Sequence, residues 1–290
     1  MDRGAGIRVR VVRVGEILTR TTGYLDGVTS HSLQPYRGCS YGRALCGVGC
    51  YVQHHGLLTR GAAWGHFLDV RANAAESYRA GAPRERRWAR RARGGFSIFL
   101  SSATDPFVPQ ERRQGVTRSV LDAMLDEPPD GLVVQTHSAD VARELGRLRA
   151  LAACCALRVH VSIESDRDRL PGLPPPASPV ARRLDAARRL REAGIFTVVT
   201  VAPLLPIADP RAFFRRVADC ADAAVIDHFI EGDGTPDGAR TRRTALPAAM
   251  EALRPGSTRL AYRDEIVAAA RAELPGRVGV GREGFAGRYA

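Results

Sequence analysis

Residues 38–51 read Gly38-Cys39-Ser40-Tyr41-Gly42-Arg43-Ala44-Leu45-Cys46-Gly47-Val48-Gly49-Cys50-Tyr51 and place three cysteines within twelve residues, spaced C-x6-C-x3-C. Closely spaced thiolates bind soft metals, such as zinc or the irons of an iron–sulfur cluster. A closed structural site takes four protein ligands, whereas three leave one metal position open to another molecule. The loop therefore predicts a metal centre with an open position.

Further motifs lie just before this loop and after it along the chain. They are Gln34-Pro35-Tyr36-Arg37-Gly38-Cys39, Phe67-Leu68-Asp69-Val70-Arg71-Ala72-Asn73-Ala74-Ala75-Glu76, Ser101-Ser102-Ala103-Thr104-Asp105-Pro106-Phe107, Thr136-His137-Ser138, Val161-Ser162-Ile163-Glu164 and Ala202-Pro203-Leu204-Leu205-Pro206. In this order, the motifs between about residues 15 and 230 resemble the radical S-adenosylmethionine (SAM) enzymes, in the branch related to spore photoproduct lyase.

The resemblance implies that Cys39, Cys46 and Cys50 each bind one iron of a [4Fe–4S] cluster. The fourth iron would bind the amino and carboxylate groups of SAM, and an electron from the cluster would split SAM into methionine and a 5′-deoxyadenosyl radical. That radical would abstract a hydrogen atom from an unidentified organic substrate. The resemblance also implies an electron donor such as flavodoxin or ferredoxin.

The loop departs from the C-x3-C-x2-C spacing of that family by three residues before Cys46 and one before Cys50. We expect the glycine-rich loop to absorb the insertions, because longer loops cost little additional free energy to close. The family has an aromatic residue before the last cysteine, packed on the adenine of SAM. Gly49 occupies that position here, so Tyr51 or the loop backbone would make this contact.

The remaining SAM contacts are also implied by the resemblance. The turn containing Ser102, Thr104 and Asp105 would line the SAM pocket, and this interpretation is favoured over the alternative that Asp105-Pro106 merely starts a turn. His137 stands where the family often has a lysine that faces the SAM carboxylate; alternatively, it is the exposed neighbour of a helix cap at Ser138.

Ser162 and Glu164 alternate onto one face of a predicted strand, which directs both toward the interior of a barrel. The resemblance implies that Ser162 hydrogen-bonds to SAM, whereas a lone serine on a strand is more often structural. Glu164 is a candidate contact to SAM or to the substrate.

A zinc site is the alternative metal interpretation. The three thiolates with His54 or His55 would complete a four-ligand knuckle, and the chain would then be a zinc-stabilised nucleic-acid-binding protein. The net charge of +12 favours nucleic acid as a partner. All 43 basic residues are arginine, however, which is typical of a GC-rich genome, so nucleic acid is possible but not favoured.

Repair or modification of a DNA or RNA lesion by the same radical chemistry is a second alternative. In spore photoproduct lyase, a cysteine just before the Ser/Thr-Asp turn returns a hydrogen atom to the repaired base. The corresponding residues are Ser101, Ser102 and Ala103, which cannot donate a hydrogen atom in this way. The sequence therefore favours another organic substrate.

The chain has no run of about 18 apolar residues, and its first ten residues lack the apolar core of a signal peptide. We therefore expect a cytoplasmic protein without a membrane segment. In that compartment the other cysteines, Cys154, Cys155 and Cys220, are expected to be core residues and not disulfide partners.

Strands alternate with helices from residue 96 onward, which predicts a parallel sheet with right-handed crossovers. Strands are predicted at 7–13, 32–37, 96–100, 132–136, 159–163, 196–201 and 223–230. Helices are predicted at 69–78, 84–93, 110–125, 140–153 and 178–193, with another starting at Asp209 and short ones over 244–274. The predicted N-caps are Asp69 for the first of these helices, Ser138 for 140–153 and Ser178 for 178–193. Six of these strands suit an incomplete (β/α)6 barrel of the TIM type, which the resemblance also implies. A doubly wound sheet is the alternative.

The predicted organisation has three parts. Residues 1–30 form an N-terminal strand and lead-in, 31–231 the partial barrel, and 232–290 a C-terminal helical extension. In a barrel of this kind, functional side chains gather at the carboxyl ends of the strands. Thr104-Asp105, Thr136-His137 and Ser162-Glu164 all follow or end predicted strands.

Overall fold

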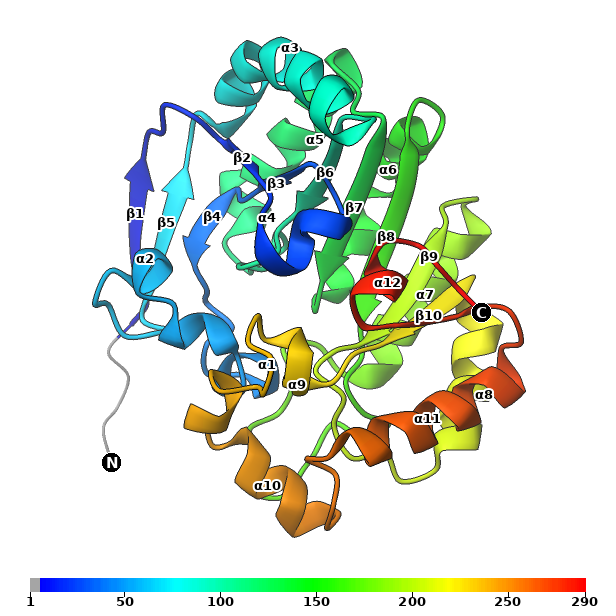
Figure 1. Cartoon of the computed structure of the whole chain (residues 1–290). Coiled ribbons are helices and arrows are strands. Elements are labelled where there is room, and N and C mark those ends of the chain that lie inside the picture. The colour runs from blue at the N-terminus through cyan, green and yellow to red at the C-terminus, as the bar shows by residue number, and fades with distance from the viewer. Residues whose placement is uncertain (1–5) are drawn as a thin grey trace.

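The structure is a computed structural model, and it describes residues 6–290. Residues 1–5, which belong to the predicted lead-in and to the segment tested for a signal peptide, lie outside the described residues. Figure 1 shows a twisted central sheet with helices behind it and a smaller sheet at its side.

The larger sheet has eight strands. In spatial order they are β11 (Val278–Val280), β10 (Ala223–Ile226), β9 (Thr197–Val201), β8 (Ala156–Ser162), β7 (Gly131–Thr136), β6 (Ser97–Leu100), β3 (His31–Leu33) and β2 (Leu18–Arg20). All pairs from β3 to β11 are parallel, and β2 pairs antiparallel with β3. The prediction of a mixed α/β fold with a parallel sheet is confirmed.

The smaller sheet has three strands in the order β1 (Arg8–Val12), β5 (Phe67–Arg71) and β4 (Tyr36–Gly38). β1 is parallel and β4 antiparallel to β5. The sheet stands beside the cysteine loop, which leaves β4 directly at Gly38.

The helices fall into long crossovers and short loop segments. The α-helices are α1 (Leu45–Val48), α2 (Gly56–Thr59), α3 (Ala74–Arg93), α4 (Glu111–Gln114), α5 (Val116–Asp126), α6 (Leu145–Ala152), α7 (Val180–Glu192), α8 (Pro210–Cys220), α9 (Phe229–Gly232), α10 (Leu246–Leu253), α11 (Leu260–Glu273) and α12 (Gly281–Phe285). The 3-10 helices are η1 (Gly23–Gly27), η2 (Tyr51–His54), η3 (Ala139–Glu144) and η4 (Thr241–Arg243).

Each face of the large sheet has its own apolar contacts, because successive strand residues point to opposite faces. On β6, Ile98 and Leu100 join the main core under the helices, whereas Phe99 points to the other face. There Phe99 packs in a cluster with Val133 and with Phe285 of α12. Figure 1 shows α12 in front of the strands and α5, α6 and α7 behind them.

Several predicted elements are wrong in their bounds. The strand predicted at 32–37 is divided between β3 and β4, because Pro35 has no N–H for a continuous ladder. The helix predicted to start at Asp69 begins at Ala74, since Asp69 lies in β5 and binds Arg10 and Arg37. That helix then continues through Pro83 to Arg93 as one helix instead of two.

Predicted helix caps had mixed outcomes. Ser138 accepts a hydrogen bond from Asp140 N at 3.2 Å, and Asp209 accepts one from Ala212 N at 2.9 Å, as expected. Ser178 is not a cap: the first amide of α7, Val180 N, donates to Asp168 Oδ1 at 2.6 Å instead. The last strand is shorter than predicted, ending at Ile226, and β11 and α12 follow the predicted C-terminal helices.

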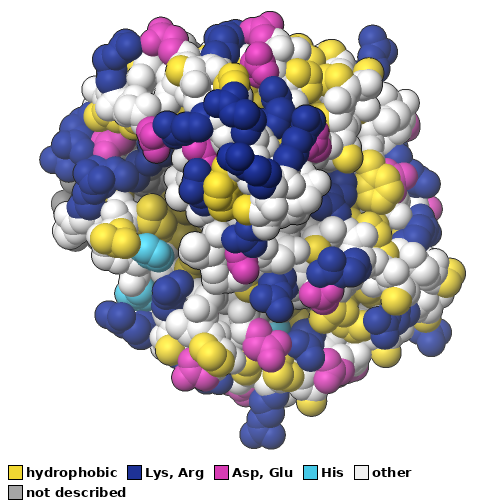
Figure 2. Space-filling model, turned by 45° about the horizontal axis from the view of Figure 1, so that its top comes forward, with side chains coloured by type: hydrophobic (Ala, Val, Ile, Leu, Met, Phe, Trp, Pro, Cys, Tyr) yellow, Lys and Arg dark blue, Asp and Glu magenta, His cyan; other side chains and the backbone are white. Residues whose placement is uncertain are grey.

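The arginines of α3 are partly neutralised by acidic neighbours. Arg79 pairs with Asp126 at 2.7 Å and Arg90 with Asp130 at 3.0 Å. Figure 2 shows basic side chains gathered on this face with acidic ones between them. Among residues 6–290, no helix combines the length and apolar content needed to cross a bilayer.

Candidate functional site

The cysteine loop is held tightly against the large sheet. Tyr41 donates its hydroxyl to Phe107 O at 2.9 Å, and Ser40 donates to Gln110 Oε1 at 2.8 Å. A side chain on Gly47 would meet Tyr41 O at 2.1 Å, so this position requires glycine for close packing of the loop on itself. Glycine in the loop thus allows the inserted residues to fold compactly between the three cysteines.

The three cysteines line one cavity of about 590 Å³, within the usual size of a small-molecule site. Cys39 follows β4, Cys46 lies on α1 and Cys50 immediately precedes η2. Burial raises the pKa of the Cys39 thiol to about 12 and that of Cys50 to about 11. Burial also raises the pKa of Cys46, and the negative charges of Glu164 and of the other two cysteines add to this effect.

The donor set fits an iron–sulfur cluster. Three soft sulfur donors face one cavity, and metal binding would displace their protons. A search of residues 6–290 finds no group of three or more His, Cys, Asp or Glu side chains arranged around a single metal ion. In a cluster, by contrast, each of the three thiolates binds a different iron, so the sulfurs stand farther apart than the ligands of one ion.

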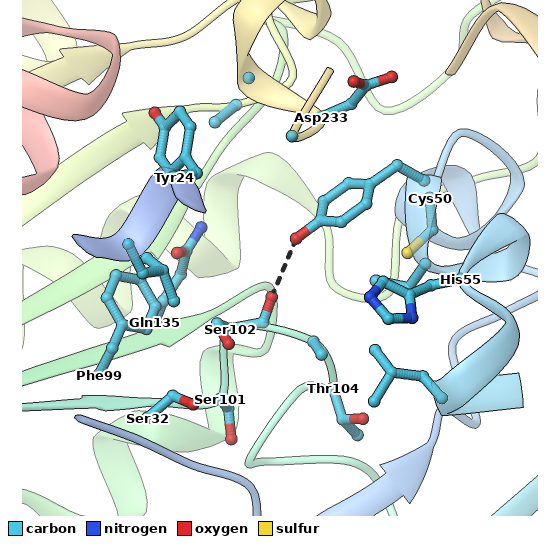
Figure 3. Close-up of a pocket in the computed structure, with 18 of the residues that line it drawn as sticks. Tyr24, Ser32, Cys50, His55, Phe99, Ser101, Ser102, Thr104, Gln135 and Asp233 are labelled. Carbon is cyan, nitrogen blue, oxygen red and sulfur yellow. Dashed lines mark hydrogen bonds between the residues drawn. The ribbon is translucent and has the colours of Figure 1, made fainter. Parts of the chain in front are cut away.

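Most of the predicted SAM contacts line the same cavity. These are Tyr51, Ser102, Thr104, Asp105 and His137. The Tyr51 hydroxyl donates to Ser102 O at 3.4 Å, which connects the cysteine loop to the turn after β6. In Figure 3, Cys50 and His55 lie on one side of the cavity, and Tyr24, Phe99 and Gln135 lie on the other.

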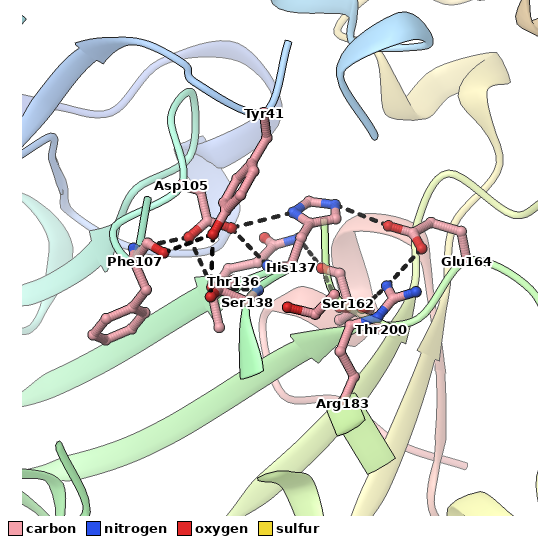
Figure 4. A network of polar contacts seen from close by, with 12 residues as sticks. Tyr41, Asp105, Phe107, Thr136, His137, Ser138, Ser162, Glu164, Arg183 and Thr200 are labelled. Atoms are coloured by element: carbon pink, nitrogen blue, oxygen red, sulfur yellow. Dashed lines mark hydrogen bonds and ion pairs between the residues drawn. The ribbon is translucent and has the colours of Figure 1, made fainter. Parts of the chain in front are cut away.

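Asp105 organises the turn after β6 and the end of β7. Its Oδ1 accepts from Thr136 Oγ1 and from Phe107 N, each at 2.8 Å, and its Oδ2 accepts from His137 N at 2.7 Å (Figure 4). These bonds occupy both carboxylate oxygens. Asp105 therefore positions the strand ends and the His137 side chain beside the cavity.

His137 lies between two carboxylates. Its Nε2 is 3.1 Å from Glu164 Oε1, and its Nδ1 is 3.6 Å from Asp105 Oδ2. Burial alone would lower the pKa of His137, but the two carboxylates outweigh it and raise the pKa to about 9. His137 is therefore an imidazolium at neutral pH and presents a positive charge to the cavity.

Glu164 and Ser162 are not among the residues that line the cavity, but each holds one that is. Glu164 binds His137 and also the fully buried Arg183, whose Nη1 donates to Glu164 Oε2 at 2.7 Å. Ser162 accepts from Gln135 Nε2 at 3.2 Å and bonds Thr200 Oγ1 at 3.0 Å. Both residues lie one layer behind the cavity wall (Figure 4).

Three polar atoms of the cavity wall have no hydrogen-bond partner within the described part of the chain. They are Ser101 Oγ, His55 Nδ1 and Trp64 Nε1, all buried. Ser101 also has a φ of 70°, which is unusual for a residue other than glycine. Unsatisfied polar atoms and strained backbone gather at ligand sites, where a bound molecule supplies the missing contacts.

Several residues in and behind the cavity wall were not predicted. Arg183 is the buried partner of Glu164; its signal was a charge on the apolar face that Val180, Leu184 and Leu190 form on α7. Asp227 follows β10, in the same strand-end position as Asp105 and His137 follow theirs. It was missed because the strand was predicted to continue to residue 230.

Comparison with solved structures identifies one fold. Spore photoproduct lyase complexed with dinucleoside spore photoproduct matches with a TM-score of 0.63 and 15% identity, covering 94% of this chain and 81% of that chain. A variant of that enzyme with bound AdoMet (SAM) and dinucleoside spore photoproduct matches with a TM-score of 0.60 and 15% identity, over the same shares of both chains. This chain has the spore photoproduct lyase fold.

The comparison confirms the resemblance found in the sequence at the level of the fold. No family model matches the chain. No curated protein matches it in sequence. The spore photoproduct lyase fold therefore places the cysteine loop and the strand ends in a known architecture, and their chemistry is argued from the residues themselves.

Proposed function

We propose that this chain is a radical SAM enzyme, with a [4Fe–4S] cluster on Cys39, Cys46 and Cys50 and SAM in the adjoining cavity. The observation that supports this best is that the three thiols line one cavity at the strand ends, in a fold similar to an AdoMet-bound lyase. When bound, the cluster and SAM supply reductive cleavage of SAM to a 5′-deoxyadenosyl radical, which takes a hydrogen atom from an unidentified organic substrate.

In this proposal, the chain's own residues bind and orient SAM. The imidazolium of His137 would bind the SAM carboxylate, and Tyr51 would contact the adenine ring. The hydroxyls of Ser102 and Thr104 would hydrogen-bond to SAM from the turn after β6. Asp105, Ser162 and Glu164 act through Thr136, Gln135 and His137, which they hold in place.

The proposal also covers the wider architecture. We interpret β3 and β6 to β10 as an incomplete (β/α)6 barrel within residues 31–231, with 1–30 as lead-in and 232–290 as an extension. Apolar side chains around the cavity, among them Val52, Trp64, Phe99 and Phe285, exclude water from the reacting atoms. A flavodoxin or ferredoxin would supply the electron, in the cytoplasm.

Anaerobic reconstitution with iron and sulfide tests this function. We expect about four irons per chain, the absorbance of a [4Fe–4S] cluster and dithionite-dependent formation of 5′-deoxyadenosine. Cys46→Ala should abolish all three, and Cys154→Ala, an exposed cysteine outside the cavity, should leave them unchanged. One stoichiometric zinc ion without SAM cleavage would contradict the proposal and support a zinc-stabilised nucleic-acid-binding protein.

Lesion repair or modification on DNA or RNA is the second candidate, because some of the solved structures similar in fold carry a dinucleoside spore photoproduct. The net charge of +12 adds to it. Ser101, Ser102 and Ala103 lack a thiol to return a hydrogen atom, so we favour another organic substrate. Salt-sensitive binding of DNA or RNA together with SAM cleavage would support the second candidate.

A further inference from the structure

The cavity extends away from the thiols to a second polar end, at the carboxyl end of β10. Asp227 follows Ile226 there, lines the cavity and is only 8% exposed. Its backbone is held on both sides, because Asp227 N donates to Val201 O at 3.0 Å and Leu204 N donates to Asp227 O at 2.8 Å. The position of this carboxyl is therefore fixed by the sheet.

The Asp227 side chain has one hydroxyl partner and little room behind it. Tyr24 of η1 donates its hydroxyl to Asp227 Oδ2 at 2.9 Å. A Cβ on Gly232 would come within 2.6 Å of the same oxygen, so the chain leaves space there only for the carboxyl. Tyr24 and Gly232 together hold the carboxyl at the cavity wall.

Three carboxylates line the cavity, and only Asp227 lacks saturating partners. Asp105 accepts from two backbone amides and from Thr136. Asp233 accepts from Thr235 N at 2.9 Å and from Thr241 N at 2.7 Å, which ties its own loop. Asp227 forms no ion pair with any residue in the range 6–290, and nearby Arg263 pairs with Glu231 and Asp264 instead.

Burial raises the pKa of Asp227 to about 7, because it outweighs the Tyr24 hydrogen bond and the more distant charge of Arg263, which both lower it. Aromatic rings surround this end of the cavity. The Tyr24 and Phe285 centroids are 6.1 Å apart, and those of Phe285 and Phe99 are 6.2 Å apart. A carboxyl among aromatic faces is the arrangement that binds organic ammonium groups.

The three arginines of the cavity wall have other partners. Arg20 donates to Glu85 at 2.8 Å, Arg71 to Gln34 O at 3.0 Å, and Arg240 to Asp233 O at 3.1 Å. None of them forms an ion pair with Asp227 among the described side chains. No arginine of the cavity wall therefore neutralises this carboxyl by direct contact, which leaves it able to bind a cationic ligand.

We propose that Asp227, supported by Tyr24, binds a protonated amino group of the substrate, so that the substrate class is small amines with an aromatic or apolar body. The inference rests on the proposed function only in assigning the thiol end of the cavity to SAM. Figure 3 shows Tyr24 and Phe99 on the side opposite Cys50, as this division requires.

Calorimetry on the reconstituted holoenzyme at pH 7.5 tests the inference with three probes of equal size. We expect benzylammonium to bind at least tenfold more tightly than benzyl alcohol or benzoate. Asp227→Asn should weaken benzylammonium binding at least tenfold. Asp219→Asn, which removes an exposed carboxylate from α8, should leave it unchanged.

Equal binding of the alcohol or the benzoate by the wild-type protein would overturn the inference, and this comparison does not depend on any variant folding correctly. Unchanged benzylammonium affinity in Asp227→Asn would overturn it as well. Tyr24→Phe keeps the ring but removes the hydroxyl that holds the carboxyl, so it should weaken benzylammonium binding, though less than Asp227→Asn does.

Saturating SAM distinguishes the substrate from SAM as the source of the amino group. Undiminished benzylammonium binding in its presence supports a substrate site. Displacement by SAM, together with a tenfold loss of SAM affinity in Asp227→Asn, would assign the carboxyl to SAM and overturn the substrate assignment. The calorimetry needs no turnover, so benzylammonium binding without 5′-deoxyadenosine formation would contradict only the proposed function.

Discussion

Arg183 donates from Nη1 to Glu164 Oε2 at 2.7 Å, and both side chains are almost completely inaccessible to solvent. The same nitrogen donates to Ser162 O at 2.5 Å. Burial would raise the pKa of Glu164, but Arg183 and His137 outweigh it and lower the pKa well below its usual range. A helix behind the sheet thereby holds the carboxylate that supports His137, one layer behind the cavity wall.

Arg183→Met should destabilise the protein by about 3–5 kcal/mol, because Glu164 would remain buried without its main cation. Chemical denaturation measures the free energy of unfolding. The double variant Arg183→Met/Glu164→Gln removes both charges and should recover part of the loss. Equal free energies of unfolding for the single variant and the wild type would show that water can solvate the Glu164 carboxylate in place of Arg183. The buried ion pair would then not be needed for stability.

His137→Gln should change how stability depends on pH. The pKa of His137 is about 9 in the folded protein and about 6.5 in an unfolded chain, so protonation favours folding. This contribution is complete below pH 6.5 and is lost as the pH rises through 9. Between pH 6.5 and pH 9 the free energy of unfolding of the wild type should fall by about 1–3 kcal/mol, and that of the variant should not show this fall.

Melting temperatures at pH 6.5, 7.5 and 9 measure this difference. His66→Gln provides the control, because His66 is exposed and should keep the wild-type slope. A His137→Gln variant whose stability falls as steeply as that of the wild type would mean that Asp105 and Glu164 do not hold His137 as an imidazolium.

Gly47→Ala should prevent cluster assembly without unfolding the chain. The added Cβ would meet Tyr41 O at 2.1 Å and Gly42 Cα at 2.3 Å, so the loop that carries Cys46 must move. We expect the iron content to fall below half of the wild-type value. Gly146→Ala on α6, where nothing lies within 4 Å of the new Cβ, should retain full iron. Normal iron in Gly47→Ala would show that the close loop packing is not needed.

The sequence predicted most of the sheet because its central strands are short apolar runs separated by helical patterns. It did not predict β2 and β11, which are three residues long and form only through pairing with distant strands. Asp69 was placed at a helix start because carboxylates favour that position. Its partners Arg10 and Arg37 lie far away in sequence, and local patterns contain no information about such contacts.

The sequence predicted those site residues that directly follow a clearly predicted strand. Thr104, Asp105 and His137 come after clear strands and line the cavity. Tyr24 comes from a 3-10 segment without a motif. Its role depends on the long-range hydrogen bond to Asp227, and only the folded chain reveals that contact.

His160→Leu should stabilise the protein, and more so in acid. His160 is fully buried, and neither ring nitrogen has a hydrogen-bond partner among residues 6–290. Unpartnered buried polar groups cost about 1–3 kcal/mol, whereas the lost stacking on Phe285 at 5.6 Å is worth about 0.5–1.5 kcal/mol. We therefore expect a gain of about 1 kcal/mol at pH 7.5.

Burial, with a smaller contribution from Arg158, lowers the pKa of His160 to about 3, so protons bind the unfolded chain more tightly. The free energy of unfolding of the wild type should fall by about 1.4 kcal/mol for each pH unit below about 6.5, and that of the variant should not show this fall. Denaturation at pH 7.5 and pH 5 should show the gap between the two proteins widen by about 2 kcal/mol. An equal difference in the free energy of unfolding at both pH values would mean that His160 finds a hydrogen-bond acceptor or a water molecule inside the fold. The conclusion that His160 is buried in its neutral form would then be wrong.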